Sequence, residues 1–187
     1  GGSQGATSLN QWVKDHLEAF ASDGVSVYCL TGMGNESSGV VEMTGPDGSS
    51  VPMRFVPFSD EMSTVLSAAD LVISRAGAGS ISEIIRCRVP SILVPYPFAA
   101  DDHQALNASF IEQKGAAIVC PQDQIEELLF EEAREVMFNE EFRAVLRRNL
   151  VATDPGDVVS DIVFDVTNVL KESGNPDVIA GALPFAG

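Results

Sequence analysis

The sequence predicts an α/β domain in which a parallel, Rossmann-like sheet carries helices on both faces. The expected strands read as nearly continuous apolar runs, such as VSVYCL at 25–30 and LVIS at 71–74, which is typical of strands covered on both sides. A helical pattern follows most of these runs, and this alternation indicates parallel strands. Glycine-rich or polar stretches follow the strand ends, where sheets of this class bind their ligands.

Hydrophobic periodicity and turn signals set the order of the elements. An amphipathic helix is predicted over 7–22, where five apolar side chains share one face: Leu9, Trp12, Val13, Leu17 and Phe20. A helix is predicted over about 60–68, and SDEM at 59–62 supplies its N-cap and its acidic first turn. Gly115 is placed to end a helix over 101–114. The other expected elements are a helix at about 80–87 and strands at 25–30, 53–58, 71–74, 91–97 and 116–120.

The remaining segments are expected to form a loop, further helices and a tail. Residues 32–50 are rich in Gly, Ser and Asn and contain a PDG turn, so they are predicted to be a loop. Beyond residue 120, helices are predicted from two apolar stripes: Phe142, Val145, Leu146 and Leu150, then Ile162, Val163, Val166, Val169 and Leu170. We therefore expect a ligand-binding domain over 1–173 and a loose tail over 174–187.

Composition and charge narrow the class of protein. The chain has 187 residues, 45% of them hydrophobic, which suits one globular domain with a sizeable core. A net charge of −16 repels nucleic-acid backbones and anionic lipid headgroups, so neither nucleic-acid binding nor direct membrane insertion is expected. No apolar run is long enough to span a membrane, and no signal peptide is recognisable, which favours the cytoplasm. The three cysteines, Cys29, Cys87 and Cys120, are expected to be buried and reduced.

The stretch SRAGAGSISEI at 74–84 is the first candidate for a ligand site. Its glycines leave a helix start bare, so three backbone N–H groups can face an anion with help from the helix dipole: those of Ala78, Gly79 and Ser80. Arg75 adds a positive charge before the turn, and the Glu83 carboxylate can accept both hydroxyls of a ribose. The structural alternative is a tight turn with a capping Ser80 and a charge pair between Arg75 and Glu83.

Two other nucleotide-binding motifs fit this stretch poorly. A dinucleotide-binding loop needs Gly or Ala where Ser82 stands, and an acidic residue where the next strand ends at Tyr96 and Pro97. A P-loop needs a Gly-Lys pair, which the sequence does not contain.

Two further stretches follow predicted strands. AADDHQALNAS at 99–109 places His103, Gln104 and Asn107 at a helix start, where they can reach the hydroxyls of a neutral ligand or form a solvated helix face. The adjacent Asp101 and Asp102 are more typical of helix capping than of a metal site. PFSDEM at 57–62 offers the backbone of Ser59 to a flat polar base, with Met62 nearby.

The opening stretch GGSQGA at 1–6 has three interpretations. It fits G-x-S-x-G, in which Ser3 is a hydrolase nucleophile and His103 its base, but no oxyanion segment accompanies it. It also fits a phosphate-binding turn in which glycines admit an anion and Ser3 donates a hydroxyl. The third interpretation is a tight turn without a ligand.

In their order along the chain, these stretches resemble the carboxyl-terminal half of the MurG family of bacterial N-acetylglucosaminyltransferases, which have the two-domain GT-B fold. The resemblance covers about residues 1–170 and implies a domain that binds the donor UDP-N-acetylglucosamine. The implied reaction transfers N-acetylglucosamine to lipid I with inversion, to form lipid II in peptidoglycan synthesis, without a metal or other cofactor. The full-length enzyme is then peripheral on the cytoplasmic face of the inner membrane.

The resemblance also implies a role for each candidate residue. Ser3 and Gln4 would lie near the diphosphate and the transferred sugar, and Ser59 and Met62 would contact the uracil. The phosphate would be bound by the amides of Ala78, Gly79 and Ser80, and the ribose by Glu83, while Arg75 shapes the nucleotide site. The sugar would be contacted by His103, Gln104 and Asn107.

The sequence departs from the family in extent. The family's amino-terminal domain, which carries the lipid acceptor site and the general base, lies outside this sequence, as does the first strand that should run into Gly1. The resemblance therefore implies a fragment or truncated product that binds donor weakly and does not transfer sugar alone. The alternatives are the donor subunit of another GT-B transferase, such as a split enzyme or a glycolipid glucosyltransferase, and a UDP-sugar epimerase or nucleotide-binding module.

Overall fold

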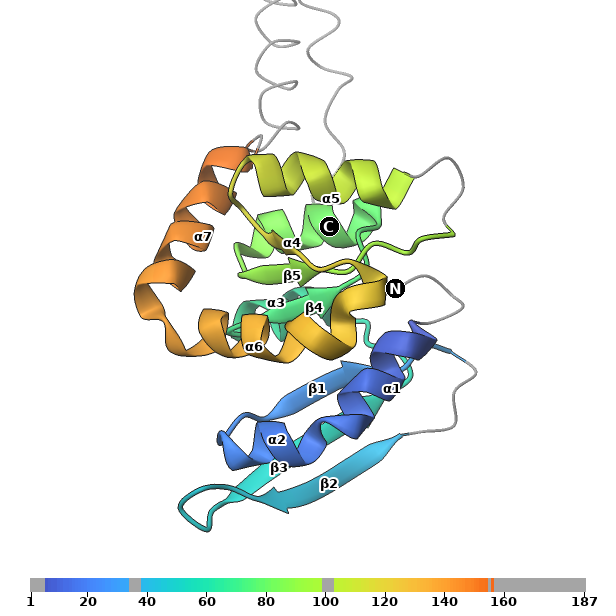
Figure 1. The fold of residues 1–187 in the computed structure, drawn as a ribbon, viewed down its shortest axis with the longest axis vertical. Coiled ribbons are helices and arrows are strands. Elements are labelled where there is room, and N and C mark those ends of the chain that lie inside the picture. The colour runs from blue at the N-terminus through green and yellow to red at the C-terminus, as the bar shows by residue number, and fades with distance from the viewer. Residues whose placement is uncertain (1–5, 34–37, 99–102, 155, 157–187) are drawn as a thin grey trace, which may run out of the picture. The chain divides into compact units, whose positions relative to one another are not determined.

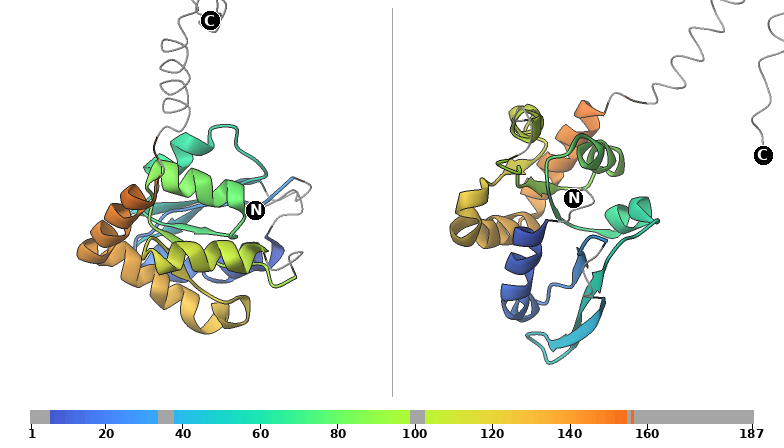
Figure 2. Two further views of the ribbon diagram at one scale, coloured as in Figure 1. Left: turned by 90° about the horizontal axis from the view of Figure 1, so that it is seen from above. Right: turned by 90° about the vertical axis from the view of Figure 1, so that its right-hand side faces the viewer.

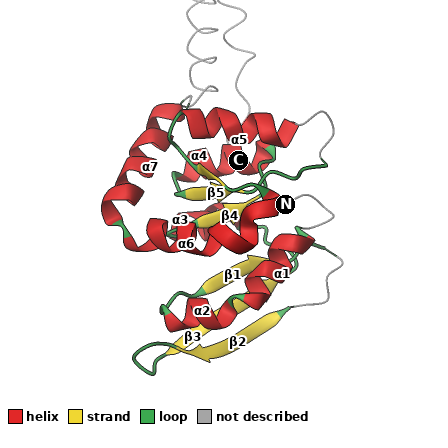
Figure 3. Cartoon of the chain, in the orientation of Figure 1, coloured by secondary structure: helices red, strands yellow, loops and turns green. Residues whose placement is uncertain are grey.

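The computed structural model describes residues 6–33, 38–98, 103–154 and 156, and Thr153 ends the compact unit that contains the elements below. Helices and strands alternate along the chain (Figures 1 and 3). The helical elements are α1 (Thr7–Asp15), α2 (Leu17–Ser22), α3 (Met62–Ala68), α4 (Ala78–Cys87), α5 (His103–Gln113), the short 3₁₀ helix η2 (Gln122–Gln124), α6 (Ile125–Phe138) and α7 (Glu140–Thr153). The strands are β1 (Val27–Leu30), β2 (Gly39–Thr44), β3 (Ser50–Val56), β4 (Val72–Ser74), β5 (Ser91–Leu93) and β6 (Ile118–Val119).

The strands form two three-stranded sheets, in the orders β1-β3-β2 and β4-β5-β6. All neighbours in the second sheet are parallel, with Ile92 of β5 opposite Ile73 of β4 and Ile118 of β6. In the first sheet β1 and β3 are parallel, whereas β2 is antiparallel to β3. The predicted α/β class with parallel strands is therefore confirmed, and one antiparallel strand is added to it.

Successive side chains of the second sheet enter two separate hydrophobic cores. In β5, Ile92 packs in one core with α1, α2 and α6, whereas Leu93 packs in the other with α3, α4, α5 and α7. Both side chains are at most 1% exposed. The predicted covering of both sheet faces by helices is thus confirmed, since alternate residues of a strand point to opposite faces (Figure 2).

Strand β2 corrects the prediction that residues 32–50 form a loop. Gly39–Thr44 pairs along its whole length with Ser50–Val56 through a turn in which the Gly45 N–H donates to the Ser49 carbonyl at 2.8 Å. β2 lies at the edge of its sheet and is mostly exposed, so it lacks the apolar run by which buried strands are recognised. β3 instead alternates, with Val51, Met53 and Phe55 buried.

Several predicted helix features are also corrected. The helix expected over 7–22 is two helices separated at His16, whose ring stacks on Trp12 at 4.3 Å between centroids. α3 begins at Met62 without a side-chain cap, because the Ser59 hydroxyl accepts the Glu61 N–H before the helix starts. On α7, Leu146 and Leu150 are buried as predicted, but Val145 is 36% exposed.

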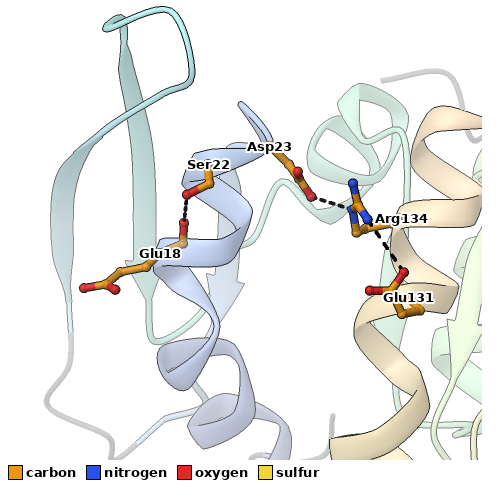
Figure 4. A network of polar contacts seen from close by, with 5 residues as sticks. All are labelled: Glu18, Ser22, Asp23, Glu131 and Arg134. Carbon is orange, nitrogen blue, oxygen red and sulfur yellow. Dashed lines mark hydrogen bonds and ion pairs between the residues drawn. The ribbon is translucent and has the colours of Figure 1, made fainter.

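The carboxyl-terminal helices are tied to the amino-terminal ones by an ion pair. The Arg134 Nε atom of α6 lies 2.8 Å from Asp23 Oδ2, directly after α2, and its Nη1 atom lies 3.6 Å from Glu131 (Figure 4). Both Arg134 and Asp23 are partly exposed, so this pair contributes at most about 1 kcal/mol. The predicted stripe at 162–170, the domain end at 173 and the tail lie outside the described residues.

The predicted end of α5 at Gly115 generates a test of the fold. Gly115 has φ +62, and a Cβ atom there would lie 2.9 Å from Asn149 Nδ2, which donates to the Gly115 carbonyl. Gly48 has φ +82 but open space around it. We expect Gly48→Ala to lower the free energy of unfolding by about 1–2 kcal/mol from backbone strain alone. Gly115→Ala should cost more, because it also displaces Asn149. Equal costs in urea titrations would contradict a role for that contact.

Candidate functional site

The start of α4 exposes a set of unpaired backbone donors. Gly77 occupies the N-cap position in an extended conformation and offers no side-chain cap, and the first helical hydrogen bond runs from the Ile81 N–H to the Gly77 carbonyl at 3.0 Å. Within the described residues, the N–H groups of the first three helical residues therefore have no hydrogen-bond partner: Ala78, Gly79 and Ser80. A helix start of this kind attracts an anion through its free N–H groups and its dipole.

The space in front of these donors is open. A Cβ atom added to Gly77 or to Gly79 would meet no atom of the described residues within 4 Å, and Ala78 and Gly79 are exposed. The glycines are thus not required by close packing in this structure. They leave room for a ligand at the backbone, as the sequence pattern predicts.

Arg75 lies in the loop between β4 and α4 and is buried, with 7% of its surface exposed. Its Nη2 atom donates to the Ser8 hydroxyl at 2.8 Å, and its Nη1 atom donates to the Gln122 side-chain oxygen and to the Val94 carbonyl. Burial lowers the pKa of Arg75, and nearby Tyr96, whose ring centroid is 5.3 Å from the guanidinium carbon, opposes this shift. The side chain nevertheless stays charged, because the ordinary pKa of arginine is far above neutrality.

The structural alternative for this stretch is wrong in both of its parts. Ser80 is the third residue of α4 and does not cap it, and α4 begins two residues before the predicted start. Arg75 makes no ion pair with Glu83 in the described part of the chain, because its guanidinium faces neutral acceptors. Glu83 is exposed on α4, one turn beyond Gly79.

Two of the side chains predicted to bind sugar hold neighbouring loops in place. The Asn107 amide of α5 donates to the Ala76 carbonyl at 3.1 Å, which fixes the loop that leads into α4. The Gln104 side-chain oxygen accepts the Tyr96 N–H at 3.0 Å, in the loop after β5. His103 is exposed at the start of α5. The structure therefore brings Arg75 and Asn107 to one loop before α4.

The other predicted residues form no hydrogen bond to this loop within the described part of the chain, or they fall outside that part. Ser59 follows β3, and no hydrogen bond within the described residues uses its backbone N–H or C=O groups, which leaves them available to a ligand. Met62 is half-buried and packs against the core beside α3. Ser3 and Gln4, together with Asp101 and Asp102, lie outside the described residues.

Sequence reasoning missed Ser8 and Gln122, which are the side-chain partners of Arg75. Gln122 follows β6, at the same edge of the sheet as the predicted ligand-binding stretches. This position at a strand end is the sequence feature that could have identified it. Ser8 lies in the first turn of α1, and nearby Asn10 donates to the Thr31 carbonyl at 2.8 Å beyond β1. These contacts tie the start of α1 to two strand ends.

The cysteines and acidic residues provide no further reactive centre in the described ranges. Cys29 and Cys120 are buried as predicted, whereas Cys87 is half-buried. Burial, with the nearby Glu132 and Asp123 carboxylates, raises the pKa of Cys120 to about 11, so it remains a thiol at neutral pH. No group of three or more His, Cys, Asp or Glu side chains is placed to hold a metal ion in the ranges that the structure describes.

A parallel sheet covered on both faces, with uncapped amides and a buried arginine in one loop, places the chain in the class of Rossmann-like α/β domains. More particularly, residues 1–154 match the glycosyltransferase family 28 C-terminal domain, and the chain belongs to this family. The chain is 43% identical over 174 residues to the UDP-N-acetylglucosamine–N-acetylmuramyl-(pentapeptide) pyrophosphoryl-undecaprenol N-acetylglucosamine transferase of Opitutus terrae, covering 93% of the chain and 46% of that relative. A Prochlorococcus marinus protein of the same name is 42% identical over 155 residues, covering 83% of the chain and 40% of that protein.

Among solved structures, MurG of Acinetobacter baumannii superimposes with a TM-score of 0.63 at 27% identity, over 83% of this chain and 44% of that one. The resemblance to the carboxyl-terminal half of the MurG family is thus confirmed, and the chain spans about half the length of the curated relatives it matches. None of the described helices is long and apolar enough to cross a membrane.

The open position at Gly79 generates a prediction about stability. Alanine has a higher helix propensity than glycine, so Gly79→Ala should raise the free energy of unfolding by about 0.5–1 kcal/mol. Gly77→Ala is the matched control, because alanine is a poorer N-cap than glycine and should not stabilise the protein. Urea titrations measure both changes. A loss of stability in Gly79→Ala would show that this glycine serves packing instead of an open site.

Proposed function

We propose that this chain is the donor-binding part of a transferase that moves N-acetylglucosamine from UDP-N-acetylglucosamine to a lipid-linked muramoyl pentapeptide. The observation that carries the proposal is the unpaired row of amides at the start of α4, next to the buried Arg75. The names of the relatives support this donor and this acceptor. The proposal keeps the donor domain within 1–173 and leaves the acceptor site and the general base to segments outside this chain.

The proposed roles follow the chemistry of the donor. The amides of Ala78, Gly79 and Ser80 receive the diphosphate, the Glu83 carboxylate accepts the ribose hydroxyls, and the Ser59 backbone faces the uracil beside Met62. Ser3 and Gln4 face the diphosphate and the sugar from the opening turn. His103 remains the sugar-facing side chain of α5, while Gln104 and Asn107 support the loops around it.

In the proposed reaction the acceptor hydroxyl oxygen attacks the anomeric carbon with inversion. The bond from that carbon to the diphosphate oxygen breaks, UDP leaves with the electron pair, and the hydroxyl proton passes to the general base. Amides fixed at a helix start stabilise the developing negative charge on UDP without reorganising during the step. The donor diphosphate therefore needs no bound cation in this proposal.

Calorimetry on the 187-residue chain tests the choice of ligand. We expect UDP and UDP-N-acetylglucosamine to bind, UDP-glucose to bind no more tightly than UDP, and NAD to give no heat. A folded sample that gives no heat with any UDP species would overturn the proposal. Preference for UDP-glucose would point instead to a glycolipid glucosyltransferase.

The ribose role of Glu83 can be tested separately from the phosphate site. Glu83→Ala removes a carboxylate acceptor, so UDP affinity should fall by about 10- to 100-fold, the equivalent of one charged hydrogen-bond pair. Inorganic pyrophosphate has no ribose, and its affinity should not fall. Glu112→Ala removes an exposed carboxylate from α5 and is the charge-matched control. Equal UDP affinity of the Glu83 variant and the wild type would remove Glu83 from the ribose role.

A further inference from the structure

The buried guanidinium of Arg75 has an unusual set of partners. Its hydrogen bonds go to the Ser8 hydroxyl, the Gln122 amide oxygen and the carbonyls of Val94 and Pro95, all of which are neutral. In the part of the chain that the structure describes, no carboxylate lies within ion-pair distance of it. The charge is therefore oriented by four acceptors but is not neutralised by any of them.

Burying a charge in this way lowers the stability of the folded protein, which suggests a function for the charge. A buried ion without a counter-ion loses hydration that neutral hydrogen bonds restore only in part. A glutamate is nearly isosteric with Gln122 and would pair with the guanidinium through a charge-assisted hydrogen bond. A purely structural clamp would gain from that pairing, so the neutral amide at this position favours a role in which the charge must stay unpaired.

Arg75 and the unpaired amides belong to neighbouring positions of the chain. Arg75 is three residues before Ala78, and the Asn107 amide holds the intervening Ala76 carbonyl. The Nη1 and Nη2 atoms of Arg75 donate to Gln122 and Ser8, on η2 and α1, and not to the loop before α4. We therefore attribute its effect on an anion at α4 to its electric field.

We propose that Gln122 and Ser8 are positioning residues of the proposed anion site: they hold the guanidinium of Arg75, which stands three residues before α4, and leave its charge available to a diphosphate. The identity of the anion as a nucleoside diphosphate rests on the proposed function. The positioning role itself concerns any diphosphate bound at the α4 amides. Gln122 and Ser8 thus act through Arg75, without contact to the ligand.

Gln122→Glu separates this role from that of a structural clamp, because it keeps the hydrogen bond to Arg75 and neutralises the charge. Gln124→Glu is the matched control, since it adds the same charge at an exposed position of η2. Without ligand, Gln122→Glu should raise the melting temperature by about 3 °C relative to Gln124→Glu, because the cation gains a counter-ion. No rise would show that the charge is already compensated and would overturn the inference.

The second measurement is the affinity of the full chain for UDP and for inorganic pyrophosphate. Gln122→Glu should weaken both by about tenfold or more, and Gln124→Glu by less than about twofold. The loss should persist at high salt, since buried charges are screened little. Unchanged affinity in Gln122→Glu would overturn the inference.

The two ligands also separate this inference from the proposed function. If the wild type binds pyrophosphate but not UDP, and Gln122→Glu weakens pyrophosphate binding, the inference stands and the proposed function fails. If the wild type binds neither, both fail.

Discussion

The burial of one guanidinium among neutral acceptors is the interaction on which the arrangement of the strand ends depends. Arg75 follows β4, Val94 and Pro95 follow β5, Gln122 follows β6, and Ser8 lies in the first turn of α1. One side chain thus links three strand ends and a helix start. Because the planar fork of arginine fixes the directions of its donors, these polar contacts orient the four segments in addition to the hydrophobic core that they share.

The packing of the second sheet determines where those strand ends lie, and the hydrogen bonds of Arg75 add to that packing. Its strands are only two or three residues long, and their neighbouring side chains enter different cores. A shift of one residue would therefore exchange the two sets of side chains between cores. The hydrophobic cores set the strand positions, and the polar contacts of Arg75 and Asn107 then fix the loops that follow them.

The sequence predicted those features that depend on local pattern. Apolar strands such as 71–74 and the helix end at Gly115 were recognisable because apolar runs and left-handed glycine positions are local signals. β2 was missed because an exposed edge strand has no apolar run. The break at His16 was missed because the apolar pattern continues through it, and the ring of His16 contacts Phe130, which is far along the chain. Gln122 was missed because its partner is 47 residues away along the chain. The bare start of α4 was recognisable from its glycines, and its role in binding stays a prediction, whereas the neutral surroundings of Arg75 depend on contacts that no local pattern contains.

The contrast between the whole chain and this loop reconciles the acidic composition with the proposed anion site. A net charge of −16 opposes the approach of a diphosphate, but exposed carboxylates are screened over about 8 Å at physiological ionic strength. The Arg75 charge is buried, so it is screened less than the surface charges. The α4 amides add a dipole that needs no titratable group. In the proposed site the local field depends on keeping acidic side chains away from Arg75, and its side-chain acceptors Ser8 and Gln122 are both neutral.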